Sequence, residues 1–127
     1  MNNIEYIMDL IDWNNSIDNQ VKGIQLAQSI GDISVFLQPC SPKYNKNVWD
    51  NCAKILSNRT DEELTPYLIE LFEWLQDLNW PGALCVFERL QNYTDTHSID
   101  ISIKICLQKA KLLNDETWEC NLNMLLS

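Results

Sequence analysis

The sequence predicts an all-α fold. About eight helices are expected to form a short right-handed stack of four antiparallel helix pairs, an α–α superhelix, in a single domain over residues 1–127. Apolar residues recur at helical spacing along nearly the whole chain. Only 3 glycines and 4 prolines occur, so tight turns are few. Residues 48–56 also align with residues 82–90, at an offset of about 34 residues that is typical of helical repeats.

Two helices are expected before Gly31. Residues 3–11 form a short amphipathic helix, which ends at the polar residues 14–16, and residues 17–30 form the second helix. The inward positions are Ile4, Ile7, Met8 and Ile11 in the first helix and Val21, Ile24, Leu26, Ala27 and Ile30 in the second. Residues 32–38 have some β-propensity, but one isolated strand would have no sheet to join.

A third helix is expected over residues 47–57, followed by a short helical turn. Its inward positions are Val48, Cys52, Ile55 and Leu56. Thr60 is followed three residues later by Glu63, which is the spacing of a capping box. In a capping box the two side chains each accept a hydrogen bond from the other residue's backbone N–H. The pattern therefore predicts that the helical turn begins at Thr60.

The next segment reads PYLIELFEWLQDLNWPGALCVFERL and predicts a helical hairpin. Thr65 is expected to cap a helix that has Pro66 at its first position, where a proline costs no hydrogen bond. That helix runs to about residue 78. A tight connection follows, and Pro81 starts the partner helix, which ends near residue 92.

Two further helices complete the chain after the polar link TDTHS. The first begins at Ser98 and runs for about 15 residues, and Asn114 or Asp115 caps the second. The inward positions are Ile99, Ile103, Cys106, Ala110 and Leu113 in the first and Trp118, Leu122 and Leu125 in the second.

The charge balance limits the kinds of partner. With 18 acidic and 9 basic residues, the net charge is −9. Nucleic acids and anionic membranes are disfavoured, because binding phosphate requires clustered Lys and Arg. A basic protein partner is favoured, since opposite fields speed association. The alternative is that the charge serves only to keep the protein soluble.

The five cysteines indicate neither a disulfide framework nor a metal site. Their number is odd, their spacing is wide, and no C-x-x-C pair occurs. Free thiols suit the cytoplasm. The N-terminus is acidic and has no basic segment of a secretory signal, and no apolar run approaches the ~18 residues of a membrane span. We therefore expect a cytoplasmic protein without a metal or cofactor.

The sequence offers no constellation for catalysis. His97, the single histidine, lies in a polar stretch where a solvated position is expected. Neighbouring Ser and Asp residues do not make a triad, because triad members meet in space. No Gly-rich phosphate loop or metal-ligand spacing occurs. The prediction is that the protein is not an enzyme, with a carboxylate pair in a groove as the weakest alternative.

An acidic row on the predicted hairpin is the leading candidate for a binding site. Between Thr60 and Glu88 there are seven acids and no base. On a helix from Pro66, three of these acids fall within about 60° of one another, with two aromatic side chains beside them. The candidate partner-binding residues are Tyr67, Glu70, Glu73, Trp74, Asp77 and Trp80. The alternatives are a solvated face for the acids and a packing role for the two tryptophans at the hairpin.

One motif in this hairpin suggests a family. The core E-W-L-Q-D-x-N-W-P comprises Glu73, Trp74, Leu75, Gln76, Asp77, Asn79, Trp80 and Pro81. It resembles small acidic HEAT-like immunity proteins that are encoded beside bacterial polymorphic and contact-dependent toxin genes. The resemblance covers residues 45–92. It implies a HEAT-like helical stack and a protein that binds and neutralises a cognate toxin domain.

The expected partner is a basic toxin domain that acts on nucleic acid, and the expected mechanism is occlusion by charge complementarity and aromatic anchors. The alternative is a HEAT-like adaptor that binds a basic or helical peptide. The gene immediately upstream discriminates between them, because an immunity protein is expected to follow its toxin.

Overall fold

A computed structural model describes residues 3–39 and 43–126, and every regular element in these ranges is helical. The all-α prediction is confirmed. The α-helices are α1 (Asn3–Leu10), α2 (Ile17–Ala27), α3 (Trp49–Ser57), α4 (Asp61–Leu64), α5 (Leu68–Glu73), α6 (Ala83–Gln91), α7 (Thr96–Leu112) and α8 (Glu116–Leu126). The 3₁₀ helices are η1 (Ile33–Phe36), η2 (Lys46–Val48), η3 (Thr65–Tyr67) and η4 (Trp74–Gln76). Cys40, one of the five cysteines, lies outside the described residues.

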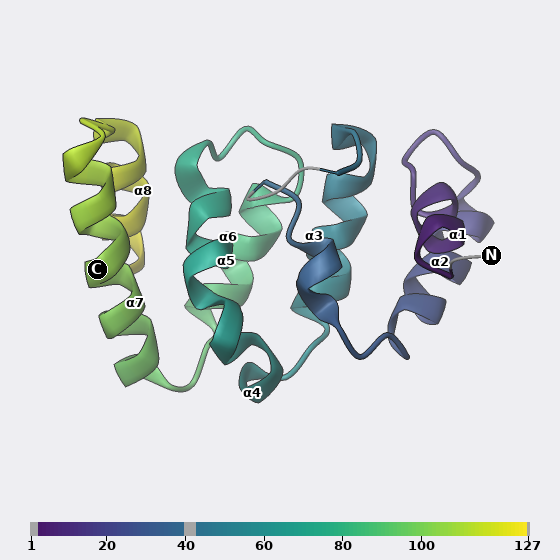
Figure 1. The fold of residues 1–127 in the computed structure, drawn as a ribbon, viewed down its shortest axis with the longest axis horizontal. Coiled ribbons are helices and arrows are strands. Elements are labelled where there is room, and N and C mark those ends of the chain that lie inside the picture. The colour runs from purple at the N-terminus through teal and green to yellow at the C-terminus, as the bar shows by residue number, and fades with distance from the viewer. Residues whose placement is uncertain (1–2, 40–42, 127) are drawn as a thin grey trace.

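The helices stand side by side in one row of pairs (Figure 1). At the N-terminal end α1 packs on α2, and at the C-terminal end α7 packs on α8. Between them α3 lies against η1, and α6 packs on η4, the 3₁₀ continuation of α5. Contacts of α2 with α3, α3 with α6, and α5 with α7 join the pairs into a stack. The segment 33–39 contributes η1 rather than a strand.

Several helix starts follow from local side-chain caps. The Thr60–Glu63 capping box is present in full, as predicted. Ser16 caps α2 by accepting from the Asn19 N–H, and Asp115 caps α8 by accepting from the Trp118 N–H at 3.0 Å. The sequence left the cap open between Asn114 and Asp115, and the structure shows that it is Asp115. These signals were readable because each involves residues only three positions apart.

The predicted cap at Thr65 is wrong. Thr65 has helical backbone angles, φ −52° and ψ −43°, instead of the extended geometry of an N-cap. Its Oγ1 donates back to the Asp61 carbonyl at 2.8 Å, so α4 runs directly into η3. Pro66 then lies within η3, and the α-helical part of the hairpin's first arm is limited to α5.

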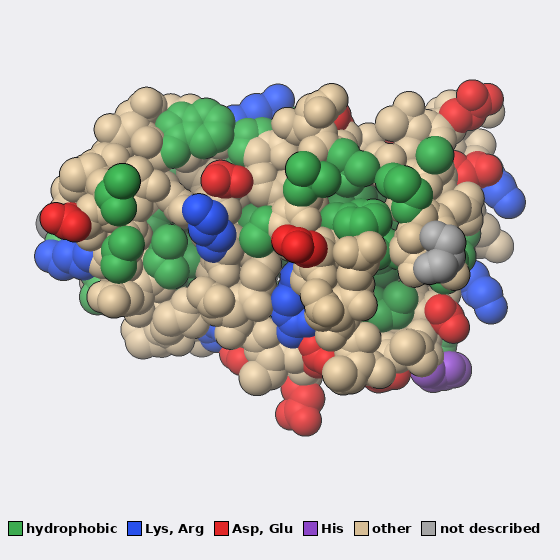
Figure 2. Space-filling view, turned by 180° about the vertical axis from the view of Figure 1, so that it is seen from behind, with side chains coloured by type: hydrophobic (Ala, Val, Ile, Leu, Met, Phe, Trp, Pro, Cys, Tyr) green, Lys and Arg blue, Asp and Glu red, His purple; other side chains and the backbone are tan. Residues whose placement is uncertain are grey.

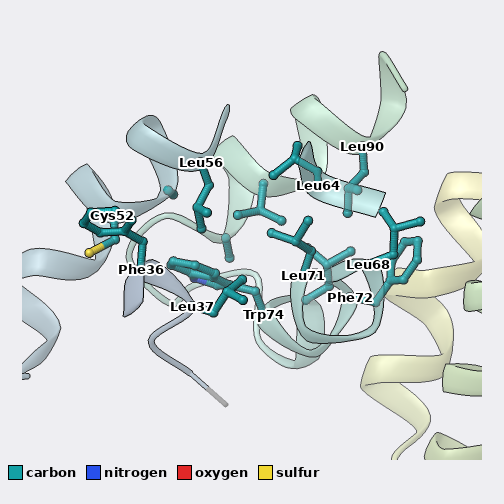
Figure 3. Packing of buried hydrophobic residues seen from close by; sticks show 14 of the residues in the cluster. Phe36, Leu37, Cys52, Leu56, Leu64, Leu68, Leu71, Phe72, Trp74 and Leu90 are labelled. Carbon is teal, nitrogen blue, oxygen red and sulfur yellow. The ribbon is translucent and has the colours of Figure 1, made fainter. Parts of the chain in front are cut away.

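A continuous apolar core runs through the stack, and Figure 3 shows its central part. Leu56, Leu64, Leu71, Phe72 and Trp74 are each no more than 2% exposed. These side chains come from α3, α4, α5 and η4, so the core fixes the relative positions of these elements.

Three predicted inward residues are in fact exposed. Val21 and Leu26 on α2 are 48% and 38% exposed, because α2 stands at the end of the stack and packs mainly on α1 and α3. The close approach is made at Gly23, where an added Cβ would lie 2.6 Å from Ile11 Cγ2. Leu113 follows the end of α7 and is 66% exposed. Within the described ranges, none of the helices has the length and apolar character that crossing a bilayer requires.

Candidate binding surface

Trp74 is a core residue, which corrects its predicted place at a partner contact. It is 0% exposed, and its Nε1 donates to the Pro81 carbonyl at 3.0 Å. Its ring meets that of Trp49 edge to face at 6.3 Å between centroids. The chain changes from α to 3₁₀ geometry at Trp74, so the 100° per residue used to place this side chain no longer applies. Trp74 therefore closes the hairpin from inside.

Glu70 and Glu73 lie beside α7. The sequence predicted both residues in an acidic row that binds a partner. Glu73 Oε1 is 3.5 Å from Lys109 Nζ on α7. Burial raises the pKa of the nearby Cys106 thiol to about 11; Lys109 opposes this shift, and the Glu73 and Glu70 carboxylates add to it. A base on α7 therefore faces the acidic row, which contains no base of its own.

Asp77, Trp80 and Tyr67 have different surroundings. Asp77 shapes the turn after η4: its Oδ1 accepts from the Asn79 N–H, and its carbonyl accepts from the Trp80 N–H. Trp80 is half-buried and meets Trp49 edge to face, with ring centroids 5.7 Å apart. Tyr67 is half-buried against the core. Of the six predicted residues, Trp74 is thus buried in the core and Glu73 is paired with Lys109.

Arg59 joins two distant parts of the chain. Its side chain is 8% exposed, and Nη2 donates to three carbonyls at the end of α2, those of Ala27, Gln28 and Ile30. Its Nη1 donates to Glu63 Oε2 at 2.7 Å. A cation at a helix C-terminus satisfies carbonyls that have no partner within the helix. The positive charge of Arg59 is therefore neutralised inside the molecule by Glu63 and by the carbonyls at the end of α2.

Arg89 makes a second internal junction. Its Nη2 donates to Asp61 Oδ1 at 2.5 Å and to the Arg59 carbonyl at 2.9 Å, and its Nε donates to the Ser57 carbonyl. Asp61 Oδ2 accepts from both the N–H and the hydroxyl of Thr94. Burial raises the pKa of Asp61, but the hydrogen bonds from Thr94 and Arg89 together outweigh it and lower the pKa below its usual range. The Asp61–Arg89–Thr94 junction is therefore held by an ionised carboxylate.

Three exposed acids, Glu62, Glu88 and Asp95, are sequence neighbours of the junction residues. We call these three residues the acidic junction surface. Figure 2 shows acidic side chains gathered along the lower edge of the molecule, where α4 lies in Figure 1. Arg59 forms an ion pair with Glu63, and Arg89 forms one with Asp61. Neither arginine is therefore paired with one of the three outer acids.

The sequence contained a signal for this surface that our interpretation did not use. Arg59 and Arg89 stand at the two ends of the run without bases, which suggests that they bridge across it. His97 is exposed as expected but lies in the first turn of α7, because α7 begins at Thr96 under the cap of Asp95. The hydrogen bonds from Ser98 lower the pKa of Asp95.

The described residues show no cluster of three or more potential metal ligands. The cysteines that the structure describes are free thiols, and burial raises the pKa of Cys52 well above its usual range.

Comparison with known proteins gives one family match and one relative. Residues 44–127 match the family model described as a domain of unknown function (DUF5071). The matched part contains α3 to α8, whereas α1, α2 and η1 precede it. An alpha N-terminal protein methyltransferase 1 of Schizosaccharomyces pombe is 36% identical over 84 residues, which cover 64% of this chain and 36% of that protein.

This chain therefore spans only about a third of the length of that relative. No solved structure matches the chain. The family match covers the Asp61–Arg89–Thr94 junction and all three residues of the acidic junction surface. The chain belongs to the DUF5071 family.

Proposed function

We propose that this protein acts by binding a basic protein partner through the acidic junction surface and that it catalyses no reaction of its own. The observation that carries the proposal is that Arg59 and Arg89 form ion pairs inside the molecule. Neither arginine is paired with the exposed acids Glu62, Glu88 and Asp95. Each of these acids is the sequence neighbour of a residue held in the junction, so its backbone is fixed and needs little ordering when a partner binds.

The net charge supports the same proposal. At −9 the whole molecule attracts a basic partner over a distance, and the local acids then orient it. Association of this kind weakens as salt is added, because the Debye length falls to about 8 Å at physiological ionic strength. Salt dependence is thus a direct signature of the proposed interaction.

For the partner we propose a cognate toxin domain, so that the protein serves as an immunity protein in the cytoplasm. The support is the resemblance of the Glu73–Pro81 segment to HEAT-like immunity proteins, together with the acidic charge. Many toxins that act on nucleic acid are basic, since they must approach phosphates. An acidic protein that covers such a surface would block the path of the substrate.

The test is co-expression with the toxin domain encoded by the gene immediately upstream. We expect cells to grow and the two proteins to purify as a complex. The double variant Glu62→Lys/Glu88→Lys should lose protection, while the matched control Glu5→Lys/Asp9→Lys on α1, with the same change in charge, should keep it. Absence of both protection and complex formation with the unaltered protein would contradict the proposal.

A second candidate, an adaptor that binds a basic or helical peptide, is favoured by a different observation. The segment shared with the S. pombe protein makes up 36% of a longer chain whose name is that of a protein methyltransferase. A segment that recurs as one part of a longer protein is typical of a binding module. An upstream gene without a toxin domain would favour this adaptor over the immunity protein.

A further inference from the structure

Two tryptophans and one lysine form a small aromatic notch near the start of α3. The rings of Trp49 and Trp80 meet edge to face, with 83° between their planes. Lys46 Nζ lies 5.5 Å from the ring centroid of Trp49 and 5.9 Å from that of Trp80. We call Trp49 and Trp80 the notch, and Lys46 is the cation it holds. A cation within about 6 Å of a ring face is attracted by the electrons of that ring.

The walls of the notch are fixed. Trp49 is 5% exposed, and its ring contacts Trp74, which is itself tied to the Pro81 carbonyl. Trp80 is held by the turn in which its N–H donates to the Asp77 carbonyl. Rigid walls lower the entropy that a ligand must lose on binding.

The cation in the notch, by contrast, is replaceable. Lys46 is exposed, and no ion pair joins it to a carboxylate in the part of the chain that the structure describes. Its ammonium belongs to a long flexible side chain, although the backbone of η2 is held by Asn45 and by a hydrogen bond from Trp13 to Asn47. Departure of this ammonium would therefore break the two ring contacts but no ion pair among the described residues.

A second feature distinguishes this notch from ordinary packing. Trp74 Nε1 donates to Pro81 and Trp118 Nε1 donates to Phe72, whereas Trp49 Nε1 is buried without an acceptor among the described residues. A buried donor without a partner is costly, so a ligand whose oxygen displaced the atoms that cover Nε1 would gain binding free energy. Backbone carbonyls of a peptide are such oxygens.

We propose that the notch binds a methylated ammonium carried by a peptide, such as a trimethyllysine side chain, and that Lys46 is an internal competitor for the same position. Methylation keeps the positive charge but makes the ammonium larger and less strongly hydrated than that of Lys46. This site is separate from the acidic junction surface, and the proposal holds or fails independently of the proposed function.

The probe is a short capped peptide that contains one trimethyllysine, titrated into the full chain and measured by calorimetry and by the indole N–H signals in NMR. We expect the signals of Trp49 and Trp80 to shift. A peptide in which carbon replaces the charged nitrogen should bind at least about tenfold more weakly, because it has the same shape without the charge. Free choline should also bind more weakly than the peptide, since it lacks the backbone carbonyls.

Variants make the test specific. Lys46→Ala should tighten binding about two- to fivefold. In the unaltered protein the cation–π contact of Lys46, at the strength usual for an exposed site, occupies the notch and lowers the apparent affinity for the peptide by that factor. Trp80→Leu should abolish binding and Trp80→Phe should weaken it, with the helical circular dichroism unchanged for the latter. Lys54→Ala, which removes an exposed lysine on the same helix as Trp49, should have no effect.

Three outcomes would overturn the proposal. Equal binding of the uncharged peptide would show that the charge is not recognised. Unchanged affinity in Lys46→Ala would show that Lys46 does not compete. Choline binding as tightly as the peptide would show that the site takes a free ammonium instead of a peptide-borne one.

Discussion

Arg89 and Asp61, 28 positions apart in the chain, meet at 2.5 Å between Nη2 and Oδ1. The contact fastens the end of α6 to the start of α4, and Thr94 completes it from the link that leads into α7. One carboxylate therefore joins α4, the end of α6 and the link that precedes α7. The acidic junction surface lies around this contact, so the junction sets both stability and the position of the proposed binding residues.

Replacing Arg89 should be costly. In Arg89→Ala the carboxylate of Asp61 loses its cation, and the Ser57 and Arg59 carbonyls lose a donor. We expect the free energy of unfolding, measured by urea denaturation, to fall by about 2–4 kcal/mol. The control Lys54→Ala breaks an exposed pair with Asp50 and should cost less than about 1 kcal/mol. Equal losses in the two variants would show that the junction is not a stabilising contact.

Stability should decline in acid, in part through Asp61. Its pKa is lower in the folded protein than its usual 3.8, so the stabilisation is present above the unfolded pKa and is lost as the pH falls through the folded pKa. Glu63 and Asp95 have pKa values lowered in the same direction by their hydrogen bonds to Arg59 and Ser98, respectively. In Asp61→Asn the decline between about pH 6 and pH 2.5 should be shallower. Urea denaturation at a series of pH values measures this, and parallel curves for the two proteins would contradict the assignment.

Gly82 should resist substitution. It has φ +84°, and an added Cβ would lie 2.7 Å from Ala53 Cβ and 2.8 Å from the Trp49 carbonyl. Gly82→Ala should lower the free energy of unfolding by about 2–4 kcal/mol, since it adds both backbone strain and a steric clash. Gly31→Ala is the matched control, because nothing lies within 4 Å of its added Cβ. Thermal unfolding of both variants gives the comparison, and a neutral Gly82→Ala would show that the chain before α6 adopts another conformation.

The same change should cost far more stability at Trp74 than at Trp13. Trp74→Leu removes a fully buried ring and its hydrogen bond to Pro81, so a loss of about 3 kcal/mol is expected. Trp13 is 47% exposed, and Trp13→Leu should cost less than about 1 kcal/mol. If Trp74→Leu unfolded at the same urea concentration as the unaltered protein, the correction that places Trp74 in the core would be wrong.

Local signals in the sequence predicted much of the fold, because the residues that make them are neighbours. Thr60 with Glu63 and the cap of α8 each involve three-residue spacings, and the inward positions of α3 follow helical periodicity. The candidate site was harder to predict. The lysine that faces Glu73 lies 36 positions later, on α7, and the change to 3₁₀ geometry at Trp74 redirects a side chain that helical spacing placed near the surface. Both effects depend on tertiary packing.

The most direct test of the central claim is the affinity of this protein for the purified toxin domain that we propose the upstream gene encodes, measured by calorimetry at several salt concentrations. We predict that affinity falls as salt rises and that Glu62→Lys/Glu88→Lys weakens binding about tenfold or more at low salt. Glu5→Lys/Asp9→Lys should leave affinity within about twofold. Equal weakening by the two double variants, or none by either, would contradict binding through the acidic junction surface.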